Sequence, residues 1–377
     1  MLVLIVKSES YFTWLCRMLS MMATIFYCGG VWADDVTVLD KVPSPIITTS
    51  PLIDGAIRTK WHPGHYILTP NGMNERGFLN VLETLRSIPN FRGIQKLYTW
   101  TSLEPEEGVY DFSEIRTDLM RLSRIGKRLV VQVQYKSFRG DLSFAPLYLN
   151  SSKFKGGTYR HGVEGRNVLL WNDAVRDRLI ALYQAMGRDL DAEVHLEAVV
   201  IPESSPGHKE YLIEAGYDEE RYAENLRRTA KALRAAFPHT VTFLYANYPK
   251  RLLDSYSGIM RETGLGLGGP DLFPYSAPLN RGTYLEYSKL FGVVPLSVAA
   301  QSENYTAREY QGAYSHTPAI EMYKFARDTL RVNYIFWLWF RRPIDYFAEV
   351  ERLIDEQIPP YGGLNSACPT KFGGCVE

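Results

Sequence analysis

Short apolar runs alternate with longer amphipathic segments along most of this chain. The apolar runs are rich in Val, Ile and Leu, which is typical of strands that are buried on both faces. Two of these runs begin at His195 and at Val293, and each ends in polar residues. The pattern predicts eight strands, carried by His62–Leu68, Ile94–Thr101, Arg128–Tyr135, His195–Ser205, Thr240–Tyr245, Gly264–Phe273, Val293–Tyr305 and Val332–Phe340.

The segments between the runs have apolar residues three or four positions apart, which is the spacing of a helix that covers a sheet. They predict helices over Asn74–Ser87, Phe112–Arg124, Asp173–Leu190, Glu219–Phe237, Lys250–Glu262, Tyr284–Phe291, Ala319–Leu330 and Ile344–Glu356. Strict alternation indicates a parallel sheet, and eight units indicate a closed α/β barrel, the (β/α)8 TIM barrel, as a single domain over 61–357. The alternative is an open doubly wound sheet, but the Gly-rich nucleotide turn that usually follows its first strand is absent from the sequence.

One connection is much longer than the others. Residues 136–171 form a polar, Gly-rich segment between the third strand and the third helix. Connections of this length within a compact domain usually have a function. We expect this segment to form a wall of the cleft at its end of the barrel, and the alternative is a mobile surface insertion.

The composition is that of an ordinary globular protein, with 46% hydrophobic and 22% charged residues among 377. The formal net charge is zero. Nucleic acid is therefore not an expected partner, because there is no basic excess to bind phosphates. The 25 Tyr, 17 Phe and 7 Trp fit a large core first, although aromatic faces also stack on sugar rings.

The N-terminus has the features of an export signal. Arg17 precedes a mostly apolar run, Met18–Tyr27, and Ala33 stands directly before an acidic pair. Residues 1–33 are therefore predicted to be a leader that sends the protein to the periplasm or outside the cell. The apolar run is too short for a stable membrane span. The residues before Cys28 match a lipid-attachment site poorly, so anchoring as a lipoprotein is not expected.

The barrel is flanked by two irregular segments, a Pro-rich lead-in over 34–60 and a tail over 358–377. Cys368 and Cys375 enclose a Gly-containing stretch of the tail, and in an exported protein they can close a small disulfide loop. The cysteines and histidines do not have the spacing of a metal site. We therefore expect neither a metal nor another cofactor.

Two glutamates stand where the fourth and the seventh predicted strands end. Glu203 directly follows Pro202, and Glu303 follows Ser302. In TIM barrels the active residues lie at the C-terminal ends of the strands, where strands four and seven face each other. Retaining glycosidases place two carboxyl groups about 5 Å apart, one as acid/base and one as nucleophile. The alternative is that each glutamate caps a helix or pairs with an arginine.

Two segments resemble those of a known group of barrel enzymes. Trp100–Phe112 reads WTSLEPEEGVYDF after the second strand, and Trp171–Leu182 reads WNDAVRDRLIAL before the fourth. With the order of the two glutamates, these segments resemble the retaining glycoside hydrolases of clan A over residues 60–357. The resemblance implies hydrolysis of a poly- or oligosaccharide by double displacement, with Glu203 as acid/base and Glu303 as nucleophile.

One position departs from the pattern of that clan. Its members usually carry Asn directly before the acid/base, where the Asn side chain binds a sugar hydroxyl, and Pro202 has no such donor. This departure supports a second hypothesis, a carbohydrate-binding barrel without turnover that acts in polysaccharide assembly or surface recognition. Under the first hypothesis, the apolar run before Glu203 and the negative charge of Glu303 predict a raised pKa for Glu203.

Further residues near the predicted mouth are candidates for substrate binding. Trp337 and Trp339 share one face of the last strand, where the resemblance implies a sugar platform and the alternative is packing against helices. The resemblance also implies that Tyr275 bonds the nucleophile, and the alternative is a tyrosine on a surface loop. The other candidates stand at or near predicted strand ends: Trp100, Gln134, Lys136, Asn247, Tyr248 and Asp271.

Overall fold

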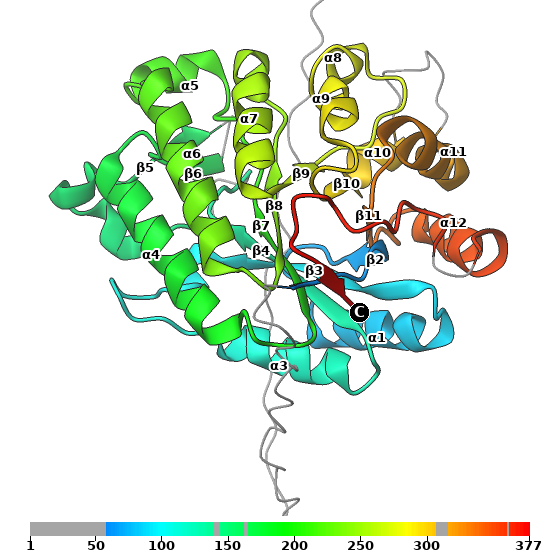
Figure 1. Ribbon diagram of the computed structural model, residues 1–377. Helices are drawn as coiled ribbons and strands as arrows, with labels where there is room; N and C mark the ends of the chain where they lie inside the picture. The colour runs from blue at the N-terminus through cyan, green and yellow to red at the C-terminus, as the bar shows by residue number, and fades with distance from the viewer. Residues whose placement is uncertain (1–57, 139–143, 162–164, 307–315, 360–361) are drawn as a thin grey trace, which may run out of the picture. The chain divides into compact units, whose positions relative to one another are not determined.

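A closed barrel of eight parallel strands forms the core of the computed structural model (Figure 1). The structure describes residues 58–138, 144–161, 165–306, 316–359 and 362–377, so the predicted leader and Cys28 lie outside the described residues. Around the barrel the order is β10-β11-β2-β3-β4-β7-β8-β9, which confirms the predicted (β/α)8 fold. The strands are β2 (Gly64–Leu68), β3 (Phe91–Thr99), β4 (Arg128–Gln134), β7 (Leu196–Ile201), β8 (Val241–Tyr245), β9 (Gly266–Gly269), β10 (Leu296–Ala300) and β11 (Tyr334–Leu338).

Helices cover the outside of the barrel between successive strands (Figure 1). Three of the longer ones begin at a polar residue whose side chain accepts from the first turn: Asn74, Asn172 and Asp218. The main helices are α1 (Glu75–Ser87), α3 (Ser113–Ser123), α4 (Asp173–Leu190), α6 (Glu219–Ala236), α7 (Leu253–Thr263), α9 (Thr283–Leu290), α11 (Ala319–Lys324) and α12 (Phe347–Arg352). The last two continue as the π-helical turns η4 (Phe325–Leu330) and η5 (Leu353–Gln357).

Six of the eight predicted strands end earlier than expected, and the fourth and the seventh stop at Ile201 and Ala300, before the two glutamates. The second strand stops at Thr99, because the Thr99 side chain accepts from Ser102 N at 3.2 Å and starts the short helix α2 (Trp100–Leu103). The sixth strand, β9, has only the four residues Gly266–Gly269. The other short helices are α5 (Lys209–Glu214), α8 (Ala277–Asn280), α10 (Ser302–Thr306) and the 3₁₀ turns η1 (Leu147–Asn150), η2 (Ser152–Phe154) and η3 (Lys250–Leu252).

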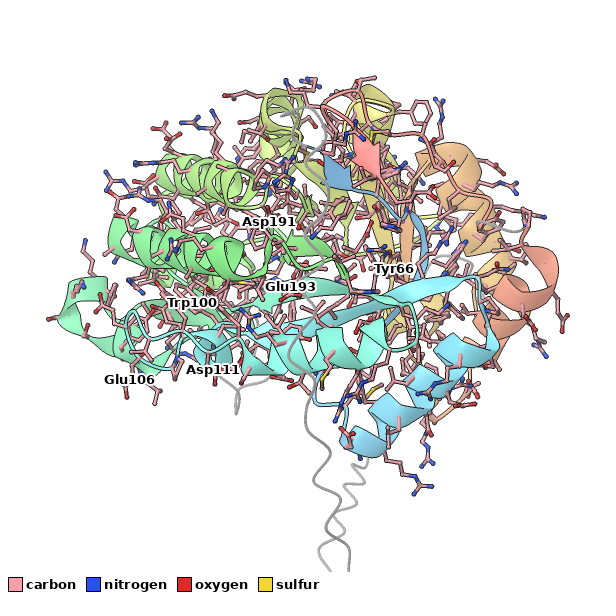
Figure 2. All side chains as sticks on the ribbon, turned by 60° about the horizontal axis from the view of Figure 1, so that its bottom comes forward. Tyr66, Trp100, Glu106, Asp111, Asp191 and Glu193 are labelled. Atoms are coloured by element: carbon pink, nitrogen blue, oxygen red, sulfur yellow. A yellow bond between two sulfur atoms is a disulfide. The ribbon has the colours of Figure 1, made fainter. Side chains whose placement is uncertain are left out.

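Aromatic rings fill the interior of the barrel. The rings of Tyr66 (labelled in Figure 2) and Phe243 lie 5.9 and 5.5 Å from the ring of Tyr334. The short Gly-rich strand β9 makes room for another ring. A Cβ atom on Gly268 would lie 2.2 Å from the Tyr245 ring, so glycine is required there for packing.

Residues 58–60 and the tail together close the end of the barrel where the strands begin. β1 (Thr59–Lys60) pairs in parallel with β12 (Cys375–Val376), and Cys368 is joined to Cys375 by a disulfide. Trp61 lies edge-on to Tyr334 inside the barrel and to Phe372 of the tail, with centroids 5.5 and 6.0 Å apart. The tail therefore packs as part of the barrel domain.

A fully buried carboxylate, Glu197, lies at this same end. It accepts from His62 N at 2.7 Å and from Tyr334 Oη at 2.7 Å, and it lies 2.9 Å from His62 Nδ1 and 4.0 Å from Arg128 Nε. Burial raises the pKa of Glu197, but the hydrogen bonds and charge of His62 and the charge of Arg128 outweigh it, so its pKa is lowered. The network thus stabilises the charged form inside the fold.

Replacing Glu197 by alanine should lower the free energy of unfolding by about 3 kcal/mol or more at neutral pH, because it strips a buried network of its acceptor. A carboxyl whose folded pKa is lowered stabilises the fold above its unfolded pKa and loses this contribution as the pH falls through the folded pKa. Urea unfolding at neutral and acidic pH measures both effects. Glu193→Ala is the control, because Glu193 is a half-exposed partner of Arg116 and its loss should cost under about 1 kcal/mol.

Candidate active site

Glu203 lies at the mouth of the barrel, just after β7. Its carboxylate accepts from Asn247 Nδ2 at 2.7 Å and from Lys136 Nζ at 3.3 Å. Lys136 and Asn247 follow β4 and β8, the two neighbours of β7 in the barrel. Lys136 is 1% exposed, whereas the side chain of Glu203 is 20% exposed. Lys136 and Asn247, which follow two other strands, therefore both bind the carboxylate of Glu203, and solvent can reach this carboxylate.

A chain of buried side chains inside the barrel fixes the strand end that carries Lys136. Tyr245 Oη donates to Gln95, Gln95 to Gln132, Gln132 to Gln134, and Gln134 to the carbonyl oxygen of Lys136, at 2.5 to 3.1 Å. A buried amide without partners is costly, so a complete chain of this kind favours one arrangement. Gln134, predicted to bind substrate, thus holds Lys136 in place.

The same two side chains also fix the backbone around Glu203. Lys136 Nζ donates to the carbonyl oxygens of Glu203, at 3.1 Å, and of Ser205. Asn247 Oδ1 accepts from Ser205 N at 3.1 Å and from Tyr248 N at 2.8 Å. The turn that follows Pro202 is therefore preorganised by buried side chains.

The surroundings of Glu203 favour its charged form. Burial raises the pKa of Glu203, but the charge of Lys136 and the hydrogen bonds from Asn247 and Lys136 outweigh burial, so the pKa lies below its usual value. Burial also lowers the pKa of Lys136, which the charge of Glu203 offsets in part. The predicted raised pKa of Glu203 is therefore wrong, because the prediction did not include the ammonium group beside it. An ionised carboxylate can accept a proton or attack, but it cannot donate one.

The pKa of Asp271 is shifted in the opposite direction. Burial, followed by the negative charges of Glu203 and Glu303, raises the pKa of Asp271 to about 7, against a smaller lowering effect of Asn304. Its backbone is fixed because its carbonyl oxygen accepts from Tyr284 Oη at 3.0 Å. Asp271, predicted only to bind substrate, therefore carries a proton at mildly acidic pH beside two other carboxyl groups.

Glu303 lies in the first turn of the short helix α10 and is exposed to solvent. Ser302 Oγ donates to its carboxylate at 2.7 Å. The next residue, Asn304, is fully buried and accepts from Gln301 N at 2.6 Å, which fixes the turn after β10. Glu203, Asp271 and Glu303 follow β7, β9 and β10, so all three lie at the end of the barrel where the strands finish, and the charges of the two glutamates raise the pKa of Asp271.

The long segment between β4 and α4 contacts this site. It contains an antiparallel hairpin, β5 (Thr158–His161) and β6 (Gly165–Val168). Tyr159 Oη donates to the carbonyl oxygen of Pro206, three residues after Glu203. His161 is 6% exposed, and burial followed by the charge of Lys136 lowers its pKa to about 4. The hairpin thus packs on the turn that carries Glu203, as expected for a cleft wall.

The predicted tryptophan platforms are not at the mouth. Inward positions of β11 are occupied by Tyr334 and Phe336, so Trp337 and Trp339 point toward the helices. Trp337 is fully buried, and its Nε1 donates to His65 Nδ1 at 3.0 Å. Trp339 packs on Phe347 with ring centroids 4.7 Å apart, and Arg341 lies 4.0 Å from its ring centroid. Helix packing, the alternative given by the sequence, describes both residues.

Trp100 is also buried. It begins the WTSLEPEEGVYDF segment, along which Trp100, Glu106 and Asp111 are labelled in Figure 2. The centre of the segment is Glu104, a fully buried carboxylate. It accepts from Trp100 Nε1 and from Gly108 N, each at 2.8 Å, and it pairs with Arg178 of α4. The segment therefore fixes the connection from β3 to α3, and Trp100 presents no face to a sugar.

The two tyrosine candidates differ in position. Tyr248 follows Asn247, is 36% exposed and lines a groove beside Glu203. Tyr275 is 52% exposed, and its hydroxyl donates to Glu321 at 2.7 Å. The resemblance implied a bond from Tyr275 to Glu303, but the hydroxyl of Tyr275 is bonded to Glu321 instead, so that prediction is wrong.

Within the described ranges, no group of three or more His, Cys, Asp or Glu side chains could hold a metal ion. None of the helices in the same ranges is long and apolar enough to cross a membrane.

No family model matches the sequence, and no curated protein matches it. Among solved structures, 333 chains match. A variant of GH5_18 from Streptomyces cattleya, in complex with Manβ1-4GlcNAc, is 13% identical with a TM-score of 0.50, over 80% of this chain and 78% of that one. The exo-β-1,4-mannosidase Op5Man5 from Opitutaceae bacterium strain TAV5 is 13% identical with a TM-score of 0.49, over 83% and 60%. Endo-glycoceramidase II from Rhodococcus sp. is 13% identical with a TM-score of 0.48, over 77% of each chain.

At these identities the likeness concerns the fold alone. It confirms the barrel fold that the resemblance to clan A glycoside hydrolases implies. Any role for Glu203, Asp271 and Glu303 must therefore be argued from the geometry and charges of this chain, not from the similar structures.

Proposed function

We propose that the protein is a glycoside hydrolase that acts on a poly- or oligosaccharide at the mouth of the barrel. The observation that carries this proposal is the set of three carboxyl groups at the strand ends, in which the pKa of Glu203 is lowered and that of Asp271 is raised to about 7. Neighbouring carboxyl groups with pKa values pushed apart are the usual arrangement for acid–base chemistry on a glycosidic bond. The glycan in the similar GH5_18 structure supports the same substrate class.

The mechanism that we propose is double displacement. A carboxylate oxygen of Glu303 attacks the anomeric carbon while the bond to the leaving oxygen breaks, and that oxygen takes up a proton. Because Glu203 starts ionised, the proton starts on Asp271, and the two residues form one coupled acid/base unit. The unit then accepts a proton from the water that releases the sugar from Glu303, which restores the starting state.

The second candidate is a carbohydrate-binding barrel without turnover. Two observations favour it: Pro202 replaces the donor expected before Glu203, and Lys136 is bonded to Glu203, the carboxylate that the resemblance assigns as acid/base. A barrel of this kind would use the same mouth to bind a glycan and would leave the glycan intact.

Export is part of the proposal. The predicted leader at residues 1–33 supports it, and so does the disulfide between Cys368 and Cys375, because structural disulfides are typical of oxidising compartments. The protein would therefore meet its glycan in the periplasm or outside the cell.

A screen of the purified protein against α- and β-linked oligosaccharides tests the function. New reducing ends should appear for at least one glycan, and the Glu203→Gln/Glu303→Gln double variant should release none. Calorimetry on the same glycans separates the two candidates. If the wild-type protein binds a glycan and never cleaves it, the binding barrel is the correct function.

A further inference from the structure

A groove of about 890 Å³ runs beside Glu203, on the side of β8. One wall is the turn that follows Glu203, together with α5, and the other is the turn from Tyr248 into η3. Ser205 lies in the groove, and Ser205 is also held by Lys136 and Asn247, the two partners of Glu203. The groove is therefore continuous with the candidate site, and a chain of sugars could occupy both.

The apolar part of the lining is suited to sugar rings. Ile213 is 70% exposed, Tyr248 is 36% exposed, and Leu212 and Tyr217 add partly buried apolar surface. Pyranose rings present C–H faces that pack on aromatic and aliphatic side chains of this kind. These side chains would recognise the shape of a sugar, but they would not select its charge.

The charged part of the lining is mostly positive. Lys209, Lys250 and Arg251 line the groove with one carboxylate, Glu219, which is paired with Arg251. Among the described residues, neither Lys209 nor Lys250 forms an ion pair or a side-chain hydrogen bond. The two lysines come from different walls, α5 and η3, so their charges face one space. Exposed ammonium groups without partners attract anionic groups of a ligand.

We propose that this groove binds the sugar units next to the point of cleavage and selects a glycan that bears carboxylate groups. The inference rests on the proposed function for the link to cleavage, while the binding itself can be measured without turnover. The apolar wall holds the rings, and the two lysines pair with acidic substituents of successive units. Acidic oligosaccharides should therefore bind more tightly than neutral ones, and added salt should weaken their binding.

Binding is measured by calorimetry on the Glu303→Gln variant, which lacks the proposed nucleophile. The probes are hexasaccharides of galacturonate, mannuronate and guluronate, with hyaluronan as a further acidic glycan and cello-, manno- and xylohexaose as neutral ones. At least one acidic glycan should bind about tenfold more tightly than every neutral one. Adding Lys209→Ala and Lys250→Ala should remove this preference, a loss of about tenfold in Kd.

The matched control carries Lys324→Ala and Lys371→Ala. Both lysines are exposed and lie outside the groove, so the two substitutions remove the same amount of charge. It should leave the preference intact, and the melting temperature of each variant reports whether the fold is kept. The inference is overturned if no acidic glycan binds preferentially, or if the groove and control variants bind alike. Binding of an acidic glycan through the lysines without cleavage by the wild-type protein would refute the glycosidase alone. Cleavage of a neutral glycan unaffected by the lysines would refute the groove alone.

Discussion

Alanine in place of Glu303 should abolish turnover of every glycan, with kcat/KM falling on the order of 10⁴-fold or more. In the proposed mechanism Glu303 forms the covalent bond to the anomeric carbon, and the neighbouring side chains Ser302 and Asn304 cannot replace it. Glu203→Ala should behave differently, because leaving groups that need no proton can still depart. It should keep cleavage of activated aryl glycosides and lose cleavage of natural glycans.

Azide separates the two roles, because it can replace a missing carboxylate. For Glu203→Ala it should restore turnover and give a glycosyl azide that retains the anomeric configuration. For Glu303→Ala it should give, at most, a product of inverted configuration. Glu321→Ala is the control, since Glu321 is bonded to Tyr275 and takes no part in the mechanism. Full activity of Glu203→Ala on a natural glycan would show that the roles are assigned incorrectly.

The second large effect concerns pH. Activity should fall about tenfold per pH unit above about 7, because Asp271 then loses the proton that the leaving oxygen needs. It should also fall at acidic pH, below the usual pKa of a glutamate, because a protonated Glu203 cannot accept the proton of the water that releases the sugar from Glu303. The basic limb of the rate profile therefore belongs to Asp271, whereas the sequence assigned the acid to Glu203.

Two variants test this assignment through the shape of the kcat/KM profile. Asp271→Asn should remove the basic limb and lower activity by about 10²-fold to 10⁴-fold. Lys136→Met should move the acidic limb to higher pH, because Glu203 loses the charge that lowers its pKa. A basic limb that stays in place in Asp271→Asn would mean that another group carries the proton.

The sequence predicted the barrel well because its signal is periodic. Apolar runs and amphipathic segments alternate, and the closed sheet follows from their number. The same reasoning placed Lys136, Asn247 and Asp271 just after parallel strands, where the structure also has them, and their part in substrate binding stays a prediction. Strand ends are thus the part of a site that a one-dimensional pattern reveals best.

The direction in which strand side chains point, and the pKa shift of Glu203, were harder to predict. Trp337 and Trp339 share one face of β11, but the sequence does not say which face points inward, and Tyr334 and Phe336 occupy the inward one. The sign of the Glu203 pKa shift depends on an ammonium group from another strand, 67 residues away in the chain. Such a contact depends on the register of neighbouring strands and on the path of the turn after Pro202.

The pairing of β1 with β12 has a practical consequence. Residues 58 and 377 lie near each other, at the end of the barrel where the strands begin, while Glu203 lies at the end where they finish. A solid support or a fusion partner joined after residue 377 would be attached to the face opposite the mouth. The protein can thus be immobilised through residue 377 with the mouth of the barrel open to the solution, and under the proposed function even an insoluble polysaccharide could then reach Glu203.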